Sequence, residues 1–505
     1  MVVSPVHFIA VPLLAAFLMP ILAKVNKNLL RIVPGIVLTY LGYVSVVLMN
    51  RVATEGTIIE VLAGWSAPWG INLVYTPFTG FLATLMIAMS FLIWLYSFKF
   101  KKVDDEPALK YFILQLMLTT GSVGLVLTGD IFNFFVFMEI IALSSYALTA
   151  FYRDRNGAEA AFKYLLIGAF ASTLFLLAIV LLYSQVGTLN MAEISVRMHD
   201  VPTSMKVSIL VLFLVGIGIE AEMFPLNGWA PDAYSQAPSP VGVAFAALVV
   251  KAGVYGLVRI TYTLFGIEGS GIGPFLIIMG GITLVMAEIT ALKQTSLKRM
   301  LAYSSIGQMG FVLIAFGIGT HEAVFGAIFL MFNHAIIKGL LFMSGSYLVY
   351  NTPNKEIKYL SGYGMKMPVI SLFFSLGALA IVGLPPFAGF WSKLYILLAA
   401  ADGALYGLIA LILVVSIIEI VYYFRVVGRL YFGKPAEGSI MRKPTVGGMI
   451  AMSILAIAIL VVGFYPDIIT GYIDAAASSI LNTDEYIKNA LGAVNELTPV
   501  ENIIQ

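Results

Sequence analysis

Cysteine is absent from the 505 residues, histidine occurs four times, and only 11% of the residues are charged. Without cysteine the chain cannot form disulfides or bind iron–sulfur clusters or zinc through thiolates. Its net charge of +2 gives no electrostatic reason to bind nucleic acid. We therefore expect no metal site, no cofactor and no catalytic centre in this chain, so that any redox chemistry belongs to another subunit.

Apolar residues dominate the sequence: 60% are hydrophobic, and the mean hydropathy is +0.96. This composition is typical of an all-α polytopic membrane protein surrounded by lipid. No basic region precedes the first apolar run, so we expect a retained anchor rather than a cleaved signal. Because about 20 apolar residues span a bilayer, the sequence predicts fourteen transmembrane segments, at about 5–24, 29–50, 73–97, 110–128, 130–151, 161–185, 204–225, 239–263, 272–292, 300–319, 324–349, 369–398, 404–428 and 447–466.

The basic residues indicate the orientation of these segments. If the N-terminus lies outside, 21 of the 29 Lys and Arg fall in cytoplasmic loops or the adjoining helix ends, and five fall on the opposite side. Cytoplasmic loops of membrane proteins are enriched in Lys and Arg. We therefore predict a multi-pass protein of the cell membrane with both termini outside.

Two of the predicted segments contain prolines that interrupt a helix, because proline lacks an N–H donor and clashes with the preceding turn. Pro225 and Pro231 break the seventh segment, and Pro385 and Pro386 break the twelfth. Since these segments are five apart, segments 4–8 and 9–13 are predicted to form two five-helix repeats of inverted topology, a pattern typical of transporters. The predicted divisions are residues 1–105 (the first three segments), 106–265 (the first repeat), 266–432 (the second repeat) and 433–505 (the last segment and a polar tail).

Charged residues at membrane depth are the candidate functional groups. Each costs roughly 2.5–3.5 kcal/mol on insertion scales and therefore usually faces a protein interior or a wet cavity. Glu139 lies near the centre of segment five. Desolvation favours the neutral form of such a carboxylate, which makes it a candidate proton carrier; a structural carboxylate bonded to a neighbouring helix is the alternative. Lys251 and Lys338 are its expected basic partners, and His334 shares a helix face with Lys338.

Further charges stand beside the two predicted helix breaks. Glu220 and Glu222 come just before the first break, and Lys393 follows the second. For Lys393, snorkelling of the ammonium toward the surface is the alternative to a functional role. A broken helix flanked by buried charges of both signs indicates an ion pathway.

Two other glutamates are secondary candidates, and the tail is expected to have a structural role. Glu419 lies in segment thirteen, where Arg425 is close enough in sequence to be its structural partner, and Glu288 lies near the end of segment nine. Both are secondary candidates. The net acidic tail from about 470 to 505 is predicted to be surface structure, with an interfacial helix or a subunit contact as alternatives.

Six stretches resemble a known family: TGDIFNFFVFMEIIALSSY, FPLNGWAPDAYSQAPSPV, SLKRMLAYSSIGQMGF, FNHAIIKGLLF, GLPPFAGFWSK and YYFRVVGRLYFG. They are similar to the antiporter-like subunits of the Mrp sodium/proton antiporters, and to the Mrp D-type subunit in particular. They also resemble the proton-pumping subunits of respiratory complex I and of archaeal membrane-bound hydrogenase and sulfane-sulfur reductase complexes. The resemblance extends from about residue 70 to residue 465.

This resemblance implies a hydrophilic axis running across the subunit in the membrane plane. Glu139 matches the family's segment-five glutamate, and Lys251 matches a segment-eight lysine. His334 and Lys338 match the segment-eleven relay. Lys393 matches the segment-twelve lysine, which the predicted orientation places nearest the outside as an exit station.

The chain departs from the family pattern before the FPL motif. The family usually has a lysine where this chain has Glu220, and the histidine that often follows FPL is Asn227. Glu139 and Glu220 would repel each other when both are charged, which favours a shared proton or a bound cation. Three interpretations follow: a modified proton path, a cation site such as one for Na⁺, or a subunit that has lost pumping.

We therefore predict an antiporter-like, ion-translocating subunit of a multisubunit membrane complex that moves H⁺, with Na⁺ as an alternative or coupled ion. The driving force is either an ion gradient or redox chemistry in partner subunits. The expected partners are other Mrp-like membrane subunits, or hydrogenase-like or complex I-like subunits that carry iron–sulfur clusters. The alternative is a non-pumping homologue that scaffolds the complex, which the residue at position 220 favours. An independent solute carrier is less consistent with the sequence, because the buried charges form a chain rather than a cluster.

Overall fold

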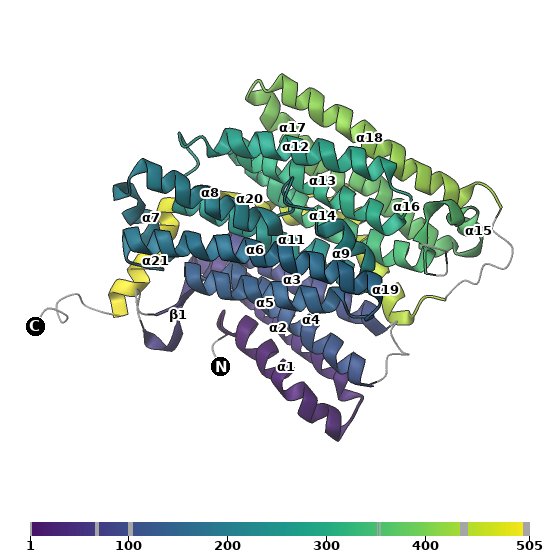
Figure 1. The fold of residues 1–505 in the computed structure, drawn as a ribbon, viewed down its shortest axis with the longest axis horizontal. Coiled ribbons are helices and arrows are strands. Elements are labelled where there is room, and N and C mark those ends of the chain that lie inside the picture. Colours follow the sequence, from purple (N-terminus) through teal and green to yellow (C-terminus); the bar gives the residue numbers. More distant parts are fainter. Residues whose placement is uncertain are drawn as a thin grey trace, which may run out of the picture.

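The architecture is a bundle of long helices that run side by side (Figure 1). The computed structural model describes residues 3–65, 70–98, 105–350, 352, 355–434 and 443–497. Within these ranges the only paired strands are β1 (Ile58–Val61) and β2 (Asn72–Tyr75), which form an antiparallel hairpin. The predicted all-α polytopic membrane architecture is confirmed.

Thirteen helices of the described part of the chain are long and apolar enough to cross a membrane. They are α1 (His7–Val25), α2 (Leu29–Glu55), α3 (Pro77–Ser97), α4 (Asp105–Leu127), α5 (Ile131–Thr149), α6 (Arg155–Val186), α8 (Thr203–Glu220), the helix Ser239–Leu264, α12 (Ile272–Lys293), α13 (Leu297–Ile318), α14 (His321–Leu348), α18 (Tyr406–Tyr431) and α19 (Val446–Phe464). The remaining predicted segment consists of two 15-residue helices, α16 (Pro368–Val382) and α17 (Ala388–Asp402). Short helices α7 (Met191–Arg197) and α15 (Tyr363–Lys366) lie in connections.

Both predicted helix breaks are present. Helix α8 ends at Glu220, and a stretch of turns leads to the short helix α9 (Ala230–Gln236). Residues 383–387, which include Pro385 and Pro386, separate α16 from α17. Pro225 lies inside the first break, and Pro231 lies at its far end. It occupies the first turn of α9, where a missing N–H costs nothing, and so it begins a helix. The inverted relation between the two halves stays a prediction.

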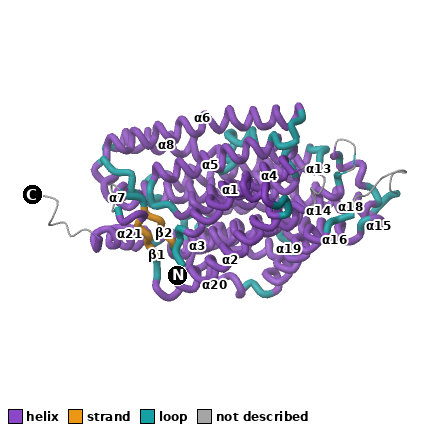
Figure 2. The backbone as a smooth tube through the Cα atoms, turned by 90° about the horizontal axis from the view of Figure 1, so that it is seen from below, coloured by secondary structure: helices purple, strands orange, loops and turns teal. Residues whose placement is uncertain are grey.

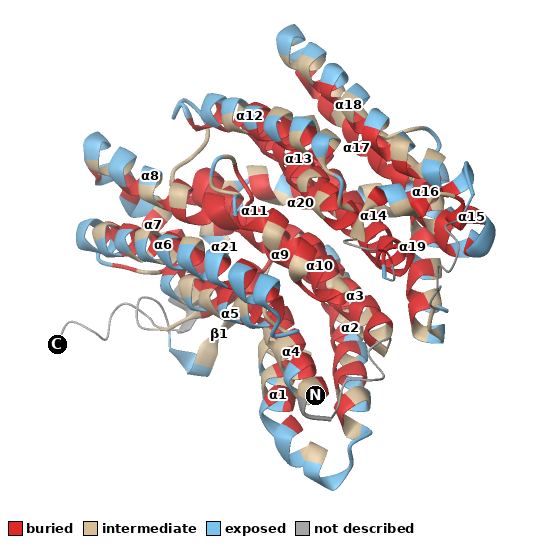
Figure 3. Ribbon diagram, turned by 45° about the vertical axis from the view of Figure 1, so that its right-hand side comes forward, coloured by how far each residue is buried: buried red, intermediate tan, exposed pale blue. Residues whose placement is uncertain are grey.

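Three helices form the centre of the bundle, and the others surround them. In the most apolar stretch of each, 100% of the residues are buried for Ser239–Leu264, 94% for α14 and 89% for α13, against 28% for α1 and for α18. The Ser239–Leu264 helix consists of α10 (Ser239–Ala244), α11 (Val250–Val258) and two π-helical stretches at Phe245–Val249 and Arg259–Leu264. Figure 3 shows α11, α13 and α14 as largely buried, with exposed faces on the outer helices.

The β-hairpin joins the two ends of the chain. The backbone N–H of Val6 donates to Glu60 on β1 at 3.2 Å, and α21 (Thr483–Leu497) packs against the same strand. Figure 2 shows both strands beside α21 and the N-terminus. Before α21, helix α20 (Asp467–Leu481) packs against α3 and α14. The tail therefore includes two packed helices, and both ends of the described chain lie on one side of the bundle; which side faces outward stays a prediction.

Helices α12 and α13 approach each other closely through glycines. A Cβ atom at Gly310 would lie 2.7 Å from the Gly280 carbonyl oxygen, and one at Gly317 would lie 2.7 Å from the Gly273 carbonyl oxygen. Small residues of this kind let two transmembrane backbones touch, which gains van der Waals contact where lipid provides no hydrophobic driving force. This contact fixes the position of α13 against α12.

Gly310→Ala should therefore destabilise the subunit, because the new methyl group pushes α12 and α13 apart. Overpacking of this kind costs about 1–3 kcal/mol. The measurement is the unfolding midpoint of the purified complex or subunit in detergent. The matched control is Gly281→Ala, whose Cβ would meet only Leu411, at an ordinary 3.4 Å. Equal midpoints for the two variants would contradict the close glycine contact.

Candidate functional site

A lysine and a histidine are hydrogen-bonded at the centre of the bundle. Lys251 on α11 and His334 on α14 are both fully buried, and the Lys251 Nζ atom bonds the His334 Nδ1 atom. The other ring nitrogen of His334 bonds the Ser305 hydroxyl on α13 at 2.9 Å. A hydrogen bond between two basic nitrogens requires that one of them offer a lone pair. The two basic groups are therefore joined by an N–H···N hydrogen bond, along which a proton can pass from one to the other.

Lys338 lies one helical turn beyond His334 and is also fully buried. Its ammonium has three donors, and three neutral oxygens accept them: the Ser304 hydroxyl at 2.7 Å, and the Leu301 carbonyl and the Tyr423 hydroxyl at 3.1 Å each. The Ser304 and Tyr423 hydroxyls also bond each other, at 3.0 Å. These three neutral acceptors hold Lys338 by their dipoles, in place of a fixed ion pair.

Lys393 on α17 forms a buried ion pair with Glu419 on α18. The Lys393 Nζ atom lies 2.6 Å from Glu419 Oε2 and 3.1 Å from the Val382 carbonyl at the end of α16. The Gln308 amide of α13 donates to the other Glu419 oxygen at 2.8 Å. Lys393 is 7% exposed, so it does not snorkel to the surface. The second helix break thus presents a backbone carbonyl to the lysine.

The expected pairing of Glu419 with Arg425 is wrong. The Arg425 guanidinium donates to the backbone carbonyls of Leu292 and Gln294 at 3.0 and 3.1 Å. These carbonyls belong to the C-terminal end of α12, where carbonyls have no partner within the helix and accept a cation readily. Arg425 therefore caps α12, and Glu419 belongs to the buried chain of charges.

Glu288 on α12 was only a secondary candidate from the sequence, but its surroundings place it among the buried charged groups. It is fully buried, and neither carboxylate oxygen has a hydrogen-bond partner among the described residues. A Cβ atom at Gly307 would lie 2.1 Å from Glu288 Oε1, so the carboxylate occupies space that only glycine leaves open. The charges of Glu419, Lys393 and Lys338 act on it. The adjacent Gly307 and Gln308 of α13, one facing each glutamate, are the sequence signal that could have indicated it.

The opposite end of the chain of charges is acidic. Glu139 on α5 is half-buried and accepts a hydrogen bond from Ser172 on α6, so the expected direct pairing with Lys251 or Lys338 is wrong. Glu220, at the end of α8, is 5% exposed and accepts a bond from the Tyr164 hydroxyl at 3.4 Å. The charges of Glu139 and Glu222 act on Glu220.

Aromatic stacking holds this acidic end in place. The Tyr164 ring lies parallel to the Trp229 ring with their centroids 3.8 Å apart, and the Trp229 indole donates to the Ile219 carbonyl at 3.1 Å. Trp229 thus ties the far side of the helix break to the last turn of α8. The tyrosine that bonds Glu220 is positioned by the same contact.

Glu222 lies inside the first break and is fully buried. The cations whose charges act on it are Lys251 and Lys338. Glu222 therefore connects the acidic end to the basic centre. The half-buried Glu139 and eight buried groups form a chain with acids at one end, bases in the middle and a mixed cluster at the other end. In order they are Glu139, Glu220, Glu222, Lys251, His334, Lys338, Glu288, Glu419 and Lys393.

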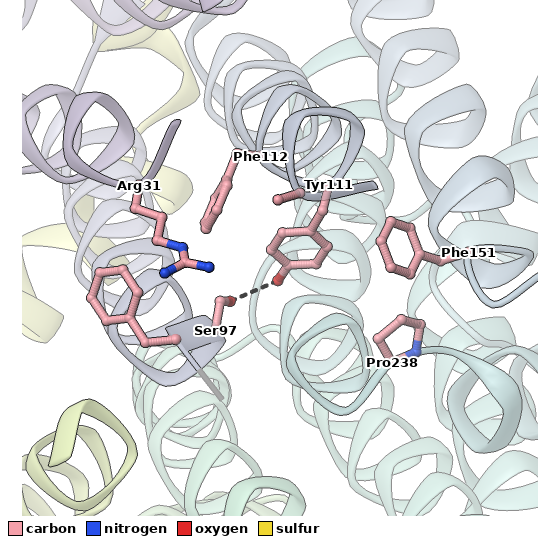
Figure 4. A pocket seen from close by; sticks show the side chains of 8 residues that line it. Arg31, Ser97, Tyr111, Phe112, Phe151 and Pro238 are labelled. Atoms are coloured by element: carbon pink, nitrogen blue, oxygen red, sulfur yellow. Dashed lines mark hydrogen bonds between the residues drawn. The ribbon is translucent and has the colours of Figure 1, made fainter. Parts of the chain in front are cut away.

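This chain is packed into the bundle and does not line the small pocket of Figure 4. That pocket is formed by Arg31, Ser97, Phe98, Ala108, Tyr111, Phe112, Phe151 and Pro238, with a 2.8 Å hydrogen bond between the Ser97 and Tyr111 hydroxyls. Its lining includes none of the charged groups of the chain. Among the described residues, no group of three or more His, Asp or Glu side chains is arranged to hold a metal ion.

Residues 128–419 match the protein family described as "NADH:quinone oxidoreductase/Mrp antiporter, TM". This match includes more than half of the chain. The chain belongs to this family. Among its relatives, the N subunit of the NADH-quinone oxidoreductase of Desulforudis audaxviator (strain MP104C) is 32% identical over 487 residues, which cover 91% of this chain and 95% of the relative.

Two further relatives extend the comparison. The D subunit of the Na(+)/H(+) antiporter of Alkalihalophilus pseudofirmus is 28% identical over 488 residues, covering 96% of this chain and 98% of the relative. A chain of the membrane-bound sulfane sulfur reductase, an archaeal respiratory membrane complex, shares the fold with a TM-score of 0.90 and 40% identity, covering 96% of this chain and 100% of that chain. The predicted resemblance is confirmed: the protein is an antiporter-like, multi-pass subunit of the kind found in such multisubunit complexes.

The ion pair at the second break gives a test of this geometry. Glu419→Gln should lower the free energy of unfolding by about 3–5 kcal/mol, because it leaves Lys393 buried without its counter-charge. The double variant Glu419→Gln/Lys393→Met should lose less than the sum of the two single variants. Denaturant or thermal unfolding of the four proteins gives the coupling energy.

Arg425→Gln provides the matched control for that cycle. Because Arg425 bonds α12 carbonyls and not Glu419, its effect should simply add to that of Glu419→Gln. Strong coupling of Glu419 to Arg425, with none to Lys393, would contradict the pairing described above.

Proposed function

We propose that this antiporter-like subunit translocates protons along the buried chain from Glu139 to Lys393, with Na⁺ as a coupled ion where the complex exchanges the two. The observation that carries this proposal is the hydrogen-bonded Lys251–His334 pair in the most deeply buried part of the bundle. A structural ion pair would place an acid against the lysine. Two basic side chains that are hydrogen-bonded to each other can exchange a proton, and this is the simplest role for such a pair.

The surroundings of the pair support the same function. Ser305 continues the path from His334 at 2.9 Å, and Lys338 lies beside the linked hydroxyls of Ser304 and Tyr423. A hydroxyl can both donate and accept a hydrogen bond, so a proton can enter on one side and leave on the other. Beyond Lys338 the chain reaches Lys393, which forms an ion pair with Glu419.

The charges along the chain also couple the protonation state of each group to that of its neighbour. A lysine that loses its proton no longer compensates its neighbouring carboxylate, so the neighbour favours its neutral form. A change of protonation at one end thus alters the next group in turn. In this proposal a change of protonation begins at Glu139 and Glu220 at one end of the chain. Lys393 releases the proton at the other end.

The partners supply the energy in this proposal. The named relatives belong to a quinone oxidoreductase, a Na⁺/H⁺ antiporter and a respiratory sulfur reductase. We infer that neighbouring Mrp-like membrane subunits contact this chain, and that the drive is either an ion gradient or redox chemistry in subunits with iron–sulfur clusters. We further propose that segments 4–8 and 9–13 are inverted repeats and that both chain ends face outward.

A scaffold without transport is the second candidate, and Glu220 is the observation that favours it. The resemblance leads us to expect a lysine there, yet this chain places a carboxylate within reach of Tyr164 and the charge of Glu139. Such a subunit would keep its fold and its buried charges while its acidic end no longer passes protons. Transport measurements distinguish the two functions.

Proton flux into vesicles that contain the assembled complex is the decisive measurement. Glu139→Ala and Lys338→Ala should each lower the flux about tenfold or more, since each removes a group that exchanges the proton. Lys358→Ala is the control, because Lys358 is exposed and forms a surface ion pair with Glu356. Assembly of each complex is checked before flux is compared.

Glu220→Lys separates the two candidate functions. If the present carboxylate is an adaptation of a working path, wild type conducts and Glu220→Lys changes the flux. If the subunit is a scaffold, wild type and all variants assemble, and neither Glu139→Ala nor Lys338→Ala alters the flux of the complex. The second result would overturn the proposed function.

A further inference from the structure

The backbone at Glu222 is in a conformation that side chains rarely adopt. Its φ angle is +58°, in the left-handed region that glycine enters freely and other residues enter at a cost. Four other described non-glycine residues share this feature: Ala63, Arg153, Lys355 and Ala404. None of these four is fully buried, whereas Glu222 has no exposed surface.

A glutamate at this position is unfavourable for a second reason. Within the described part of the chain, neither of its carboxylate oxygens has a hydrogen-bond partner. The Tyr234 hydroxyl is the nearest polar group that acts on the carboxylate, and it too is buried without a hydrogen-bond partner among these residues. Buried carboxylates are usually bonded or paired because desolvation is costly. Strained and unsatisfied residues of this kind concentrate at functional sites, where the surrounding structure holds them in place.

Glu222 lies between the acidic end of the chain and the basic groups Lys251, His334 and Lys338, and this position indicates its role. The charges of Lys251 and Lys338 act on it, while Glu220, two residues earlier, faces Tyr164 and the charge of Glu139. The break in α8 therefore turns one carboxylate toward the acidic end and the next toward the lysines. The side-chain nitrogen of Lys251 is hydrogen-bonded to His334, and Glu222 is the carboxylate whose charge acts on this lysine.

We propose that Glu222 is the acid that exchanges protons with the Lys251–His334 pair in this chain. This inference rests on the proposed function and names the step that joins its acidic end to its basic centre. A protonated Glu222 transfers its proton to the neutral Lys251–His334 pair, which leaves a carboxylate beside a cation. The reverse transfer restores two neutral groups, so charge and proton balance in both directions. The backbone just before Glu222 packs directly on α11, since a Cβ atom at Gly253 would lie 2.7 Å from the Ala221 backbone nitrogen, two residues from Lys251.

Replacing Glu222 separates its chemistry from its backbone strain. Glu222→Gly and Glu222→Gln both remove the carboxylate, but only glycine relieves the positive φ. Proton flux in vesicles should fall about fivefold or more in both variants, because the exchanging group is lost. The unfolding midpoint of Glu222→Gly should lie above that of Glu222→Gln by about a degree or two. Glu222→Asp keeps a carboxylate and should retain part of the flux that the other two variants lose.

Ala404→Gly is the matched control for the backbone. Ala404 has a φ of +53° in the exposed turn between α17 and α18. This variant should raise the unfolding midpoint without lowering the flux. It shows that relief of a positive φ does not by itself affect transport.

The outcomes distinguish this inference from the function on which it rests. Full flux in Glu222→Gly and Glu222→Gln, together with loss in Lys338→Ala, would overturn the role of Glu222 and leave the proton path standing. Full flux in all of these variants would overturn the path itself. Equal loss in Glu222→Asp and Glu222→Gly in an intact complex would assign Glu222 a role in shape rather than in proton exchange, and would also overturn the inference.

Discussion

The structure depends on how charges are accommodated inside an apolar bundle. An ion at this depth is costly unless other groups compensate it, and each lysine of the axis meets this constraint differently. Lys393 has a carboxylate at 2.6 Å. Lys338 has three neutral oxygens, and Lys251 has the ring nitrogen of a histidine. Lys393 is therefore compensated by an opposite charge, whereas Lys338 and Lys251 are held by neutral groups.

Glycines and helix breaks fix the positions of the buried charged groups. A Cβ atom at Gly253 would lie 2.6 Å from the Glu220 carbonyl oxygen, so the end of α8 rests directly on α11 two residues after Lys251. Gly307 leaves space for Glu288 in the same way. At the second break, the end of α16 exposes the Val382 carbonyl to Lys393. Irregular backbone is tolerated in a membrane where it lines such a polar interior.

Hydropathy and proline position are local signals, and for this reason much of the architecture can be predicted from the sequence. They indicate fourteen segments, the two breaks, and the burial of Glu220, Lys251, His334, Lys338 and Lys393. They cannot indicate which groups meet, because pairing depends on helices distant in sequence. Sequence proximity pairs Glu419 with Arg425, whereas its partner Lys393 lies 26 residues away on another helix. Glu288 has no signal within its own segment, because Gly307, the glycine that leaves space for it, is on α13.

At the first break, the sequence spacing of Glu220 and Glu222 does not predict which groups each glutamate contacts. In a continuous helix Glu220 and Glu222 would point to nearly opposite faces, and one of them would meet lipid or a hydrophobic neighbour. Because α8 ends between them and the backbone at Glu222 turns into the left-handed region, both carboxylates stay inside the protein. One faces the acidic end and the other faces the lysines. In the proposed path, Glu222 therefore provides the connection between Glu220 and Lys251.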